Sequence, residues 1–331
     1  MKRWILGSAI AAFVALIAGL TLGPVIFRDA PATPGPSPDQ SPTLTRDGMT
    51  GTIKVVASTN VWASVIEIIG GDWVEVTAII DSAAQDPHSY EATARDQLAI
   101  QDAELVIANG GGYDEFMDQL VSATDGDRIF LELVEGEHGH TEDNHEATDA
   151  EAAVVDTHEN EHIWYDLHAV AEAAELIAEA INELRPEAFD DVNQNYDFFA
   201  SELENLQLRV DSLRDRALGL GVIAVEGVGN LMLTDAGFEN LTPQNLADAI
   251  EEEREVPLTA ADEARTLIKN KLVVLLVTNT QVQDAVSADL VKMAESVGTP
   301  VVELSEVIPS EDLDYLDWMA SVIDRLQQAI Y

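Results

Sequence analysis

One apolar stripe constrains the fold of this 331-residue chain more than any other feature. Starting at Phe189, apolar side chains recur at alternating intervals of three and four residues as far as Ala217, which keeps them on one face of a helix. The stripe has these positions: Phe189, Val192, Tyr196, Phe199, Leu203, Leu206, Val210, Leu213 and Ala217. A coiled-coil dimer also uses such a stripe. Because an α/β pattern lies on each side, we expect a monomer in which one long, rigid helix, residues 187–218, links two domains.

Short apolar runs alternate with helical patterns before and after this stripe. The expected strands are residues 52–59, 73–80, 104–110, 221–227, 271–279 and 299–304. The expected helices are residues 61–70, 91–102, 243–252, 259–270, 283–297 and 312–329. Alternating strands and helices indicate βαβ units with parallel sheets. We therefore predict an α/β protein with an N-terminal domain over residues 52–186 and a C-terminal domain over residues 219–331.

The N-terminus predicts export of the chain. An uncharged apolar run from Trp4 to Phe27 follows Lys2 and Arg3. It is longer than the roughly 7–15 residues of a signal-peptide core and close to the roughly 20 residues of a membrane span. Flanking basic residues stay cytoplasmic, so the rest of the chain is expected outside. We favour an uncleaved anchor within residues 1–28 over a cleaved signal peptide.

The segment after this apolar run, residues 29–51, is rich in proline and predicts an extended tether.

The composition of the chain limits the partners that it can bind and the metal site that it can form. The chain has 61 acidic and 17 basic residues, a net charge of -44, which argues against nucleic acid as a partner. A well-solvated surface explains this excess, and a high-salt habitat would produce it too. Cysteine is absent, so disulfides and a lipid-modified cysteine are excluded, and a metal site must use histidine and carboxylates.

Residues 132–162 concentrate the candidate metal ligands. They contain 11 acidic residues, no Lys or Arg, and five of the seven histidines of the chain. These histidines are His138, His140, His145, His158 and His162. Such a polar segment is not expected to pack into a core. It is either an acidic loop that contains histidine by chance or a loop that collects divalent ions, and we favour the second.

The segment from His158 to His162 reads H-E-N-E-H, which matches the H-E-x-x-H zinc pattern of metalloproteases. That chemistry needs both histidines one turn apart on a stable helix, with Glu159 as the general base. The intervening residues are all polar, so such a helix would have no apolar face to bury. We therefore keep a zinc hydrolase as a remote alternative and expect that the protein is not an enzyme.

The flanking residues carry a family resemblance. The stretches DPHSYE (86–91) and NEHIWYD (160–166) resemble two motifs of the zinc- and manganese-binding solute-binding proteins of ABC importers, the ZnuA- and TroA-like proteins. Glu161 stands where that family usually has proline. The resemblance runs from about Thr52 to Tyr331, and the family often has a His-rich acidic loop before its second motif. It implies two α/β domains joined by one long helix, with the metal site in the cleft between them.

The resemblance also implies a set of ligands: His88, His162, Glu226 and Glu306. Glu303 and Asp312 are alternatives for the fourth ligand. Each follows or lies near the end of a strand, which is where open α/β sheets bind ligands. Two imidazoles and two carboxylates form a closed four-ligand site, which suits transport better than catalysis. Trp164 is expected to pack beneath this site.

The function implied is the extracytoplasmic binding component of an ABC importer, in the periplasm or at the cell surface. It would capture one divalent metal ion and deliver it to a membrane permease. The His-rich loop and the general order of affinities favour zinc, whereas the hard oxygen ligand Glu226 favours manganese. An adhesin or a metal buffer with the same fold is a further alternative, because fold alone does not define function.

Overall fold

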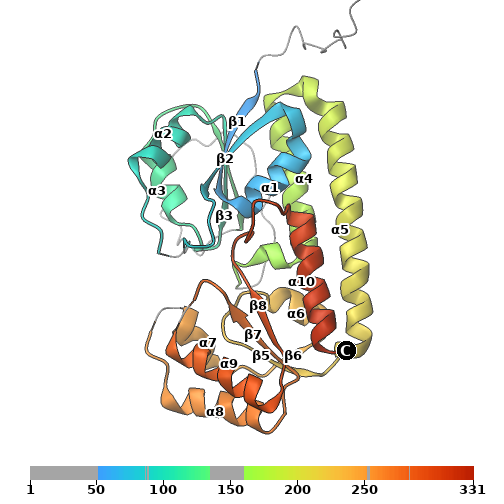
Figure 1. Cartoon of the computed structure of the whole chain (residues 1–331). Coiled ribbons are helices and arrows are strands. Elements are labelled where there is room, and N and C mark those ends of the chain that lie inside the picture. Colours follow the sequence, from blue (N-terminus) through green and yellow to red (C-terminus); the bar gives the residue numbers. More distant parts are fainter. Residues whose placement is uncertain (1–50, 86, 88, 135–159, 252–253, 283) are drawn as a thin grey trace, which may run out of the picture. The chain divides into compact units, whose positions relative to one another are not determined.

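Two parallel four-stranded sheets with flanking helices form the framework of the protein in a computed structural model (Figure 1). The structure describes residues 51–85, 87, 89–134, 160–251, 254–282 and 284–331. The predicted ligand His88, most of the His-rich loop, the N-terminal apolar run and the tether lie outside the described residues. Within the described part of the chain, no helix is long and apolar enough to cross a membrane.

The first sheet has the strand order β2-β1-β3-β4, with every pair parallel. Its strands are β1 (Ile53–Thr59), β2 (Val74–Ile80), β3 (Leu105–Gly110) and β4 (Ile129–Val134). Its helices are α1 (Asn60–Gly70), α2 (Ala94–Asp102), α3 (Phe116–Ser122) and α4 (Leu167–Leu184). Both faces are buried, as expected for a parallel sheet. Val55 packs in the same core cluster as α1 and α4, and its neighbour Val56 packs with α2 and α3.

The second sheet repeats this arrangement with the order β6-β5-β7-β8, again all parallel. Its strands are β5 (Gly221–Ala224), β6 (Glu239–Asn240), β7 (Leu275–Asn279) and β8 (Val301–Leu304). Its helices are α6 (Asn230–Asp235), α7 (Gln244–Glu251), α8 (Leu258–Lys269), α9 (Ala285–Val297) and α10 (Tyr315–Ala329). Ile223 of β5 packs with α7, α8 and α9, and the adjacent Val222 packs in the large cluster that also includes α10.

The long helix α5 (Phe189–Ala217) lies where the apolar stripe predicted it, after a short 3-10 turn at Pro186–Ala188. Its buried positions are Val192, Phe199, Leu203, Leu206, Val210, Leu213 and Ala217. The stripe is therefore buried within one chain, except that Tyr196 is half-buried and Phe189 is 56% exposed at the start of the helix. One continuous core cluster joins α5 to β1 and β3 of the first sheet and to β5 and β7 of the second (Figure 1).

Candidate metal centre

His162 is buried, and its ring is held in a defined orientation. It lies in a loop directly before the short 3-10 helix η2 (Ile163–Tyr165) and is 2% exposed. The side-chain oxygen of Asn160 accepts the backbone N–H of His162 at 2.9 Å and lies 2.9 Å from Nδ1 of its ring. The amide nitrogen of Asn160 donates to the carbonyl of Gly227 at 3.1 Å, which leaves the amide oxygen facing the ring. Nδ1 therefore faces an acceptor oxygen and donates to it, so Nε2 is the nitrogen that would ligate a metal ion.

Aromatic side chains support this ring, as the sequence predicted for Trp164. Trp164 is 1% exposed, and its ring meets that of His162 edge-on with 5.1 Å between centroids. Tyr113 stacks obliquely on Trp164 at 4.8 Å and donates a hydrogen bond from its hydroxyl to the carbonyl of Glu306 at 3.5 Å. The loop of His162 and the loop of Glu306 are thus held against the same aromatic cluster.

Glu226 lies in the loop two residues after β5, and its side chain is 4% exposed. Its Oε2 atom is buried and has no hydrogen-bond partner among the described residues. Burial raises the pKa of this carboxyl from 4.5 to about 8, a hydrogen bond with Asn279 opposes the shift, and the nearby carboxylates of Glu251, Glu306 and Asp284 add to it. A buried carboxyl with acidic neighbours is stabilised in its charged form by a cation.

Glu306 lies two residues after β8 and is 3% exposed. Its Oε1 accepts a 2.6 Å hydrogen bond from the side chain of Asn279, the last residue of β7. Its backbone N–H donates to Oε1 of Gln281 at 2.6 Å. Asn279 also lowers the pKa of the Glu226 carboxyl, so its side chain lies near both predicted ligands at neighbouring strand ends.

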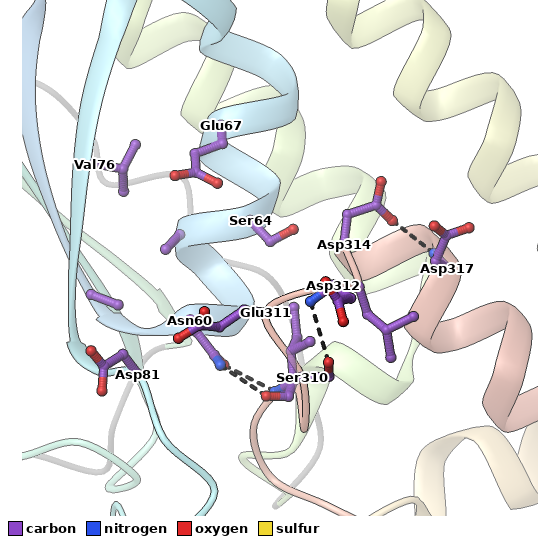
Figure 2. A pocket seen from close by; sticks show the side chains of 14 residues that line it. Asn60, Ser64, Glu67, Val76, Asp81, Ser310, Glu311, Asp312, Asp314 and Asp317 are labelled. Atoms are coloured by element: carbon purple, nitrogen blue, oxygen red, sulfur yellow. Dashed lines mark hydrogen bonds between the residues drawn. The ribbon is translucent and has the colours of Figure 1, made fainter.

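The two alternatives for the fourth ligand lie elsewhere. Glu303 is exposed on β8 and lines a hollow of about 570 Å³ that it shares with Arg325. Asp312 is exposed and lines a second pocket, of about 490 Å³, whose wall includes Glu67 and Asp81. Figure 2 shows Asp312 beside Ser310, whose hydroxyl accepts its backbone N–H at 3.2 Å. Of the three candidates, the structure brings only Glu306 to Glu226.

Glu251, the last residue of α7, also lies at this centre, although no pattern in the sequence predicts it. Its Oε2 accepts the backbone N–H of Gly227 at 3.0 Å, and its Oε1 lies 3.8 Å from Nε2 of His162. Ligand atoms of Glu161, His162 and Glu251 all lie within 4.8 Å of one another. Glu251 belongs to neither motif, and a glutamate at a helix end is common, so only the fold reveals its position.

The described part of the H-E-x-x-H pattern, residues 160–162, is not helical, whereas the zinc site of a metalloprotease needs a helix there. His158 and Glu159 themselves lie outside the described residues. His168, at the start of α4, is exposed. Its Nδ1 lies 3.8 Å from Oδ1 of Asp166, the N-cap residue of that helix.

These features define a class: an α/β binding protein with two parallel sheets and a buried cluster of imidazole and carboxylates at the strand ends. The chain belongs to the family described as zinc-uptake complex component A, periplasmic, which matches residues 55–329. That match confirms the resemblance seen in the motifs.

Known relatives differ in the metal that their names give. The manganese-binding lipoprotein MntA of Halalkalibacterium halodurans is 26% identical over 155 residues, 47% of this chain and 47% of that protein. The zinc-binding lipoprotein AdcA of Streptococcus pneumoniae is 21% identical over 276 residues, 79% of this chain and 52% of that protein. The chain thus spans about half the length of these relatives.

Solved structures share the fold. A crystal structure of ZnuA superposes with a TM-score of 0.65 at 20% identity, covering 84% of this chain and 97% of that one. The periplasmic zinc-binding protein TroA of Treponema pallidum gives 0.64 at 18% identity, covering 85% and 99%. FpvC of Pseudomonas aeruginosa, in complex with Mn²⁺, gives 0.66 at 19% identity, covering 84% and 98%. The predicted α/β fold class is confirmed.

Proposed function

We propose that this protein is the extracytoplasmic metal-binding component of an ABC importer, which captures a divalent transition metal ion and delivers it to a permease. One observation carries the proposal: His162, Glu226 and Glu306 are all buried, and hydrogen bonds of Asn160 to Gly227 and of Asn279 to Glu306 hold the loops that carry them at the strand ends of the second sheet. The aromatic packing and the amide contacts described above hold each side chain in place. This arrangement suits binding of an ion by protein groups alone.

The electrostatics of Glu226 support a cation as the substrate. Burial and three neighbouring carboxylates raise its pKa to about 8, so the metal-free site holds a proton there at neutral pH. A divalent ion would favour the ionised carboxylate and displace that proton. We retain His88, which lies outside the described residues, as a further ligand on the strength of its motif.

Zinc is our first candidate for the ion, and manganese is the alternative. The relatives support both, because AdcA is named for zinc and MntA for manganese. Zinc is generally bound more tightly than manganese by sites of this kind, whereas carboxylate oxygens suit manganese.

The same proposal assigns the N-terminal parts of the chain to the membrane. Both relatives are named lipoproteins, but this chain has no cysteine to carry a lipid. The apolar run within residues 1–28 is then the segment that would anchor it, with residues 29–51 as a tether. Residues 52–186 and 219–331 would form the two domains on either side of the linking helix, residues 187–218.

The test is a measurement of bound metal. The purified chain is stripped with a chelator, equilibrated with equal concentrations of Zn²⁺ and Mn²⁺, desalted, and analysed by mass spectrometry for ions per chain. We expect one retained ion in the wild type. His162→Ala should weaken binding by more than about 100-fold, since even the loss of a group that only supports a ligand costs about 10–100-fold.

His168→Ala is the matched control, because His168 is a nearby histidine whose side chain is 71% exposed. It should retain the ion as the wild type does. A wild-type chain that retains no ion, or a His162→Ala variant that binds normally, would overturn the proposal.

A further inference from the structure

We infer that Glu251 is an additional metal ligand, which strengthens the binding of Mn²⁺ at this centre more than the binding of Zn²⁺. The inference rests on the proposed function, which assigns the ion to the centre around His162, Glu226 and Glu306. Glu251 comes from a different element, the end of α7, and matches no motif of the sequence. Its position relative to His162 is the reason to assign it a role.

The two oxygens of Glu251 have different surroundings. Oε2 is held by the backbone N–H of Gly227 at 3.0 Å, directly beside Glu226. Oε1 is turned toward His162 and lies 3.8 Å from Nε2. Asn160 contacts Nδ1 of that ring, and Oε1 of Glu251 faces the other ring nitrogen, Nε2. One oxygen is therefore anchored, and the other is oriented toward the ligand atom of His162.

The separation of these atoms fits one shared ion. A metal ion with bonds of about 2.1 Å to an imidazole nitrogen and a carboxylate oxygen can span at most about 4.2 Å between them. The observed 3.8 Å is too long for a hydrogen bond and within that limit. A Cβ atom at Gly227 would lie 3.4 Å from Oε2 of Glu251, 3.5 Å from Nδ1 of His162 and 3.6 Å from Nδ2 of Asn160, so these side chains converge on one backbone position.

A second observation points to a ligand at the same place. Glu226, the residue before Gly227, is 4% exposed and has a buried oxygen, Oε2, without a hydrogen-bond partner among the described residues. Glu251 is close enough to act on the charge of Glu226. A cation bound beside Glu251 would offset the negative charge of both carboxylates.

A third carboxylate shifts the relative affinities of the centre for the two ions. Zinc is satisfied by four ligands and accepts imidazole readily, whereas manganese prefers more ligands and hard oxygen atoms. Glu251 adds one such oxygen to Glu226 and Glu306. It should therefore contribute more to the binding of Mn²⁺ than to that of Zn²⁺, without reversing the general preference for zinc.

The experiment titrates the metal-free full chain with Mn²⁺ alone and with Zn²⁺ alone, in the wild type and in Glu251→Gln. Glutamine keeps an oxygen for the N–H of Gly227, removes the charge, and puts an NH2 group, which cannot ligate a metal ion, in the place of Oε1. We expect Mn²⁺ affinity to fall about tenfold and Zn²⁺ affinity to fall less than about threefold, so the ratio of the two affinities changes. Asp248→Asn, on the exposed face of the same helix, should leave both affinities unchanged.

The outcomes separate the inference from the proposed function. Equal affinities in Glu251→Gln and the wild type, tighter binding by the variant, or equal losses for both ions would overturn the ligand assignment while the metal-binding function stands. A wild-type chain that binds neither ion would overturn the proposed function and this inference together.

Discussion

The carboxyl of Glu226 lies among acidic neighbours at 4% exposure, and burial raises its pKa from 4.5 to about 8. Between pH 4.5 and about 8, the carboxyl of Glu226 is ionised in the unfolded chain but still protonated in the folded chain. Stability from this group is therefore fully present below pH 4.5 and is lost as the pH rises through about 8. In metal-free protein we expect the free energy of unfolding to fall with pH across this range, by up to about 1.4 kcal/mol per pH unit from this group.

Chemical denaturation at several pH values, in the presence of a chelator, measures this dependence. Glu226→Gln has no proton to lose, so its free energy of unfolding should depend less on pH than that of the wild type. Glu303→Gln, at an exposed position on β8, should keep the wild-type dependence. If Glu226→Gln keeps the wild-type slope, the carboxyl of Glu226 ionises near its ordinary pKa.

At the residue scale, the sequence motifs indicated the candidate ligands but not the residues that orient those ligands. The family resemblance implied His162, Glu226 and Glu306 as ligands, and the structure places each of them buried. The tautomer of His162 depends on Asn160 and Gly227, which lie far apart in the sequence. Glu251 was missed because its role follows only from where α7 ends in space.

At the scale of elements, α5 is the clearest case of a helix predicted from its period. Phe199 lies in the middle of its buried stripe, is 0% exposed, and has its ring 6.1 Å from that of Tyr315 at the start of α10. Phe199→Ala should destabilise the protein by about 3–5 kcal/mol, because it removes a large buried side chain and leaves a cavity. Since α5 shares one core with both sheets, we expect the loss to shift a single unfolding transition.

Phe198→Ala is the control for this prediction. Phe198 is the preceding residue on the same helix and is 58% exposed, so its removal should change the free energy of unfolding by less than about 0.5 kcal/mol. Denaturation followed by far-UV circular dichroism and by tryptophan fluorescence tests both variants. Two separated transitions in Phe199→Ala, or equal effects of the two variants, would contradict the shared core.

Other elements show where sequence patterns fail. The strand expected at residues 271–279 begins only at Leu275, because Lys271 adopts a positive φ of 54° in the turn before it. The strand expected at 221–227 ends at Ala224, which leaves Glu226 in the loop where it can reach the site. Strand β6 has two exposed residues and therefore no apolar period to detect.

At the scale of the whole molecule, the alternation of strands and helices was enough to predict two parallel sheets. It could not predict that β1 and β5 would be central strands with the same order of neighbours, since pairing depends on contacts distant in sequence. Nor could it predict that α10 would lie beside α5 (Figure 1). Arg209 of α5 donates there to Asp324 of α10 at 2.6 Å. Buried residues of α5 and α10 belong to the core that the two sheets share.

The net charge of -44 makes self-repulsion a property of the entire chain. Added salt screens such repulsion, because the Debye length falls from about 10 Å at 0.1 M to about 3 Å at 1 M. The thermal midpoint of the metal-free protein at pH 7 should therefore rise, on the order of 5 °C, between these NaCl concentrations. The same series at about pH 5, closer to the isoelectric point of about 4.1, is the control: fewer carboxylates are ionised there, so the rise should shrink. Equal rises of the thermal midpoint at both pH values would contradict this prediction. They would indicate that salt stabilises the protein through hydrophobic or ion-specific effects and not by screening charge.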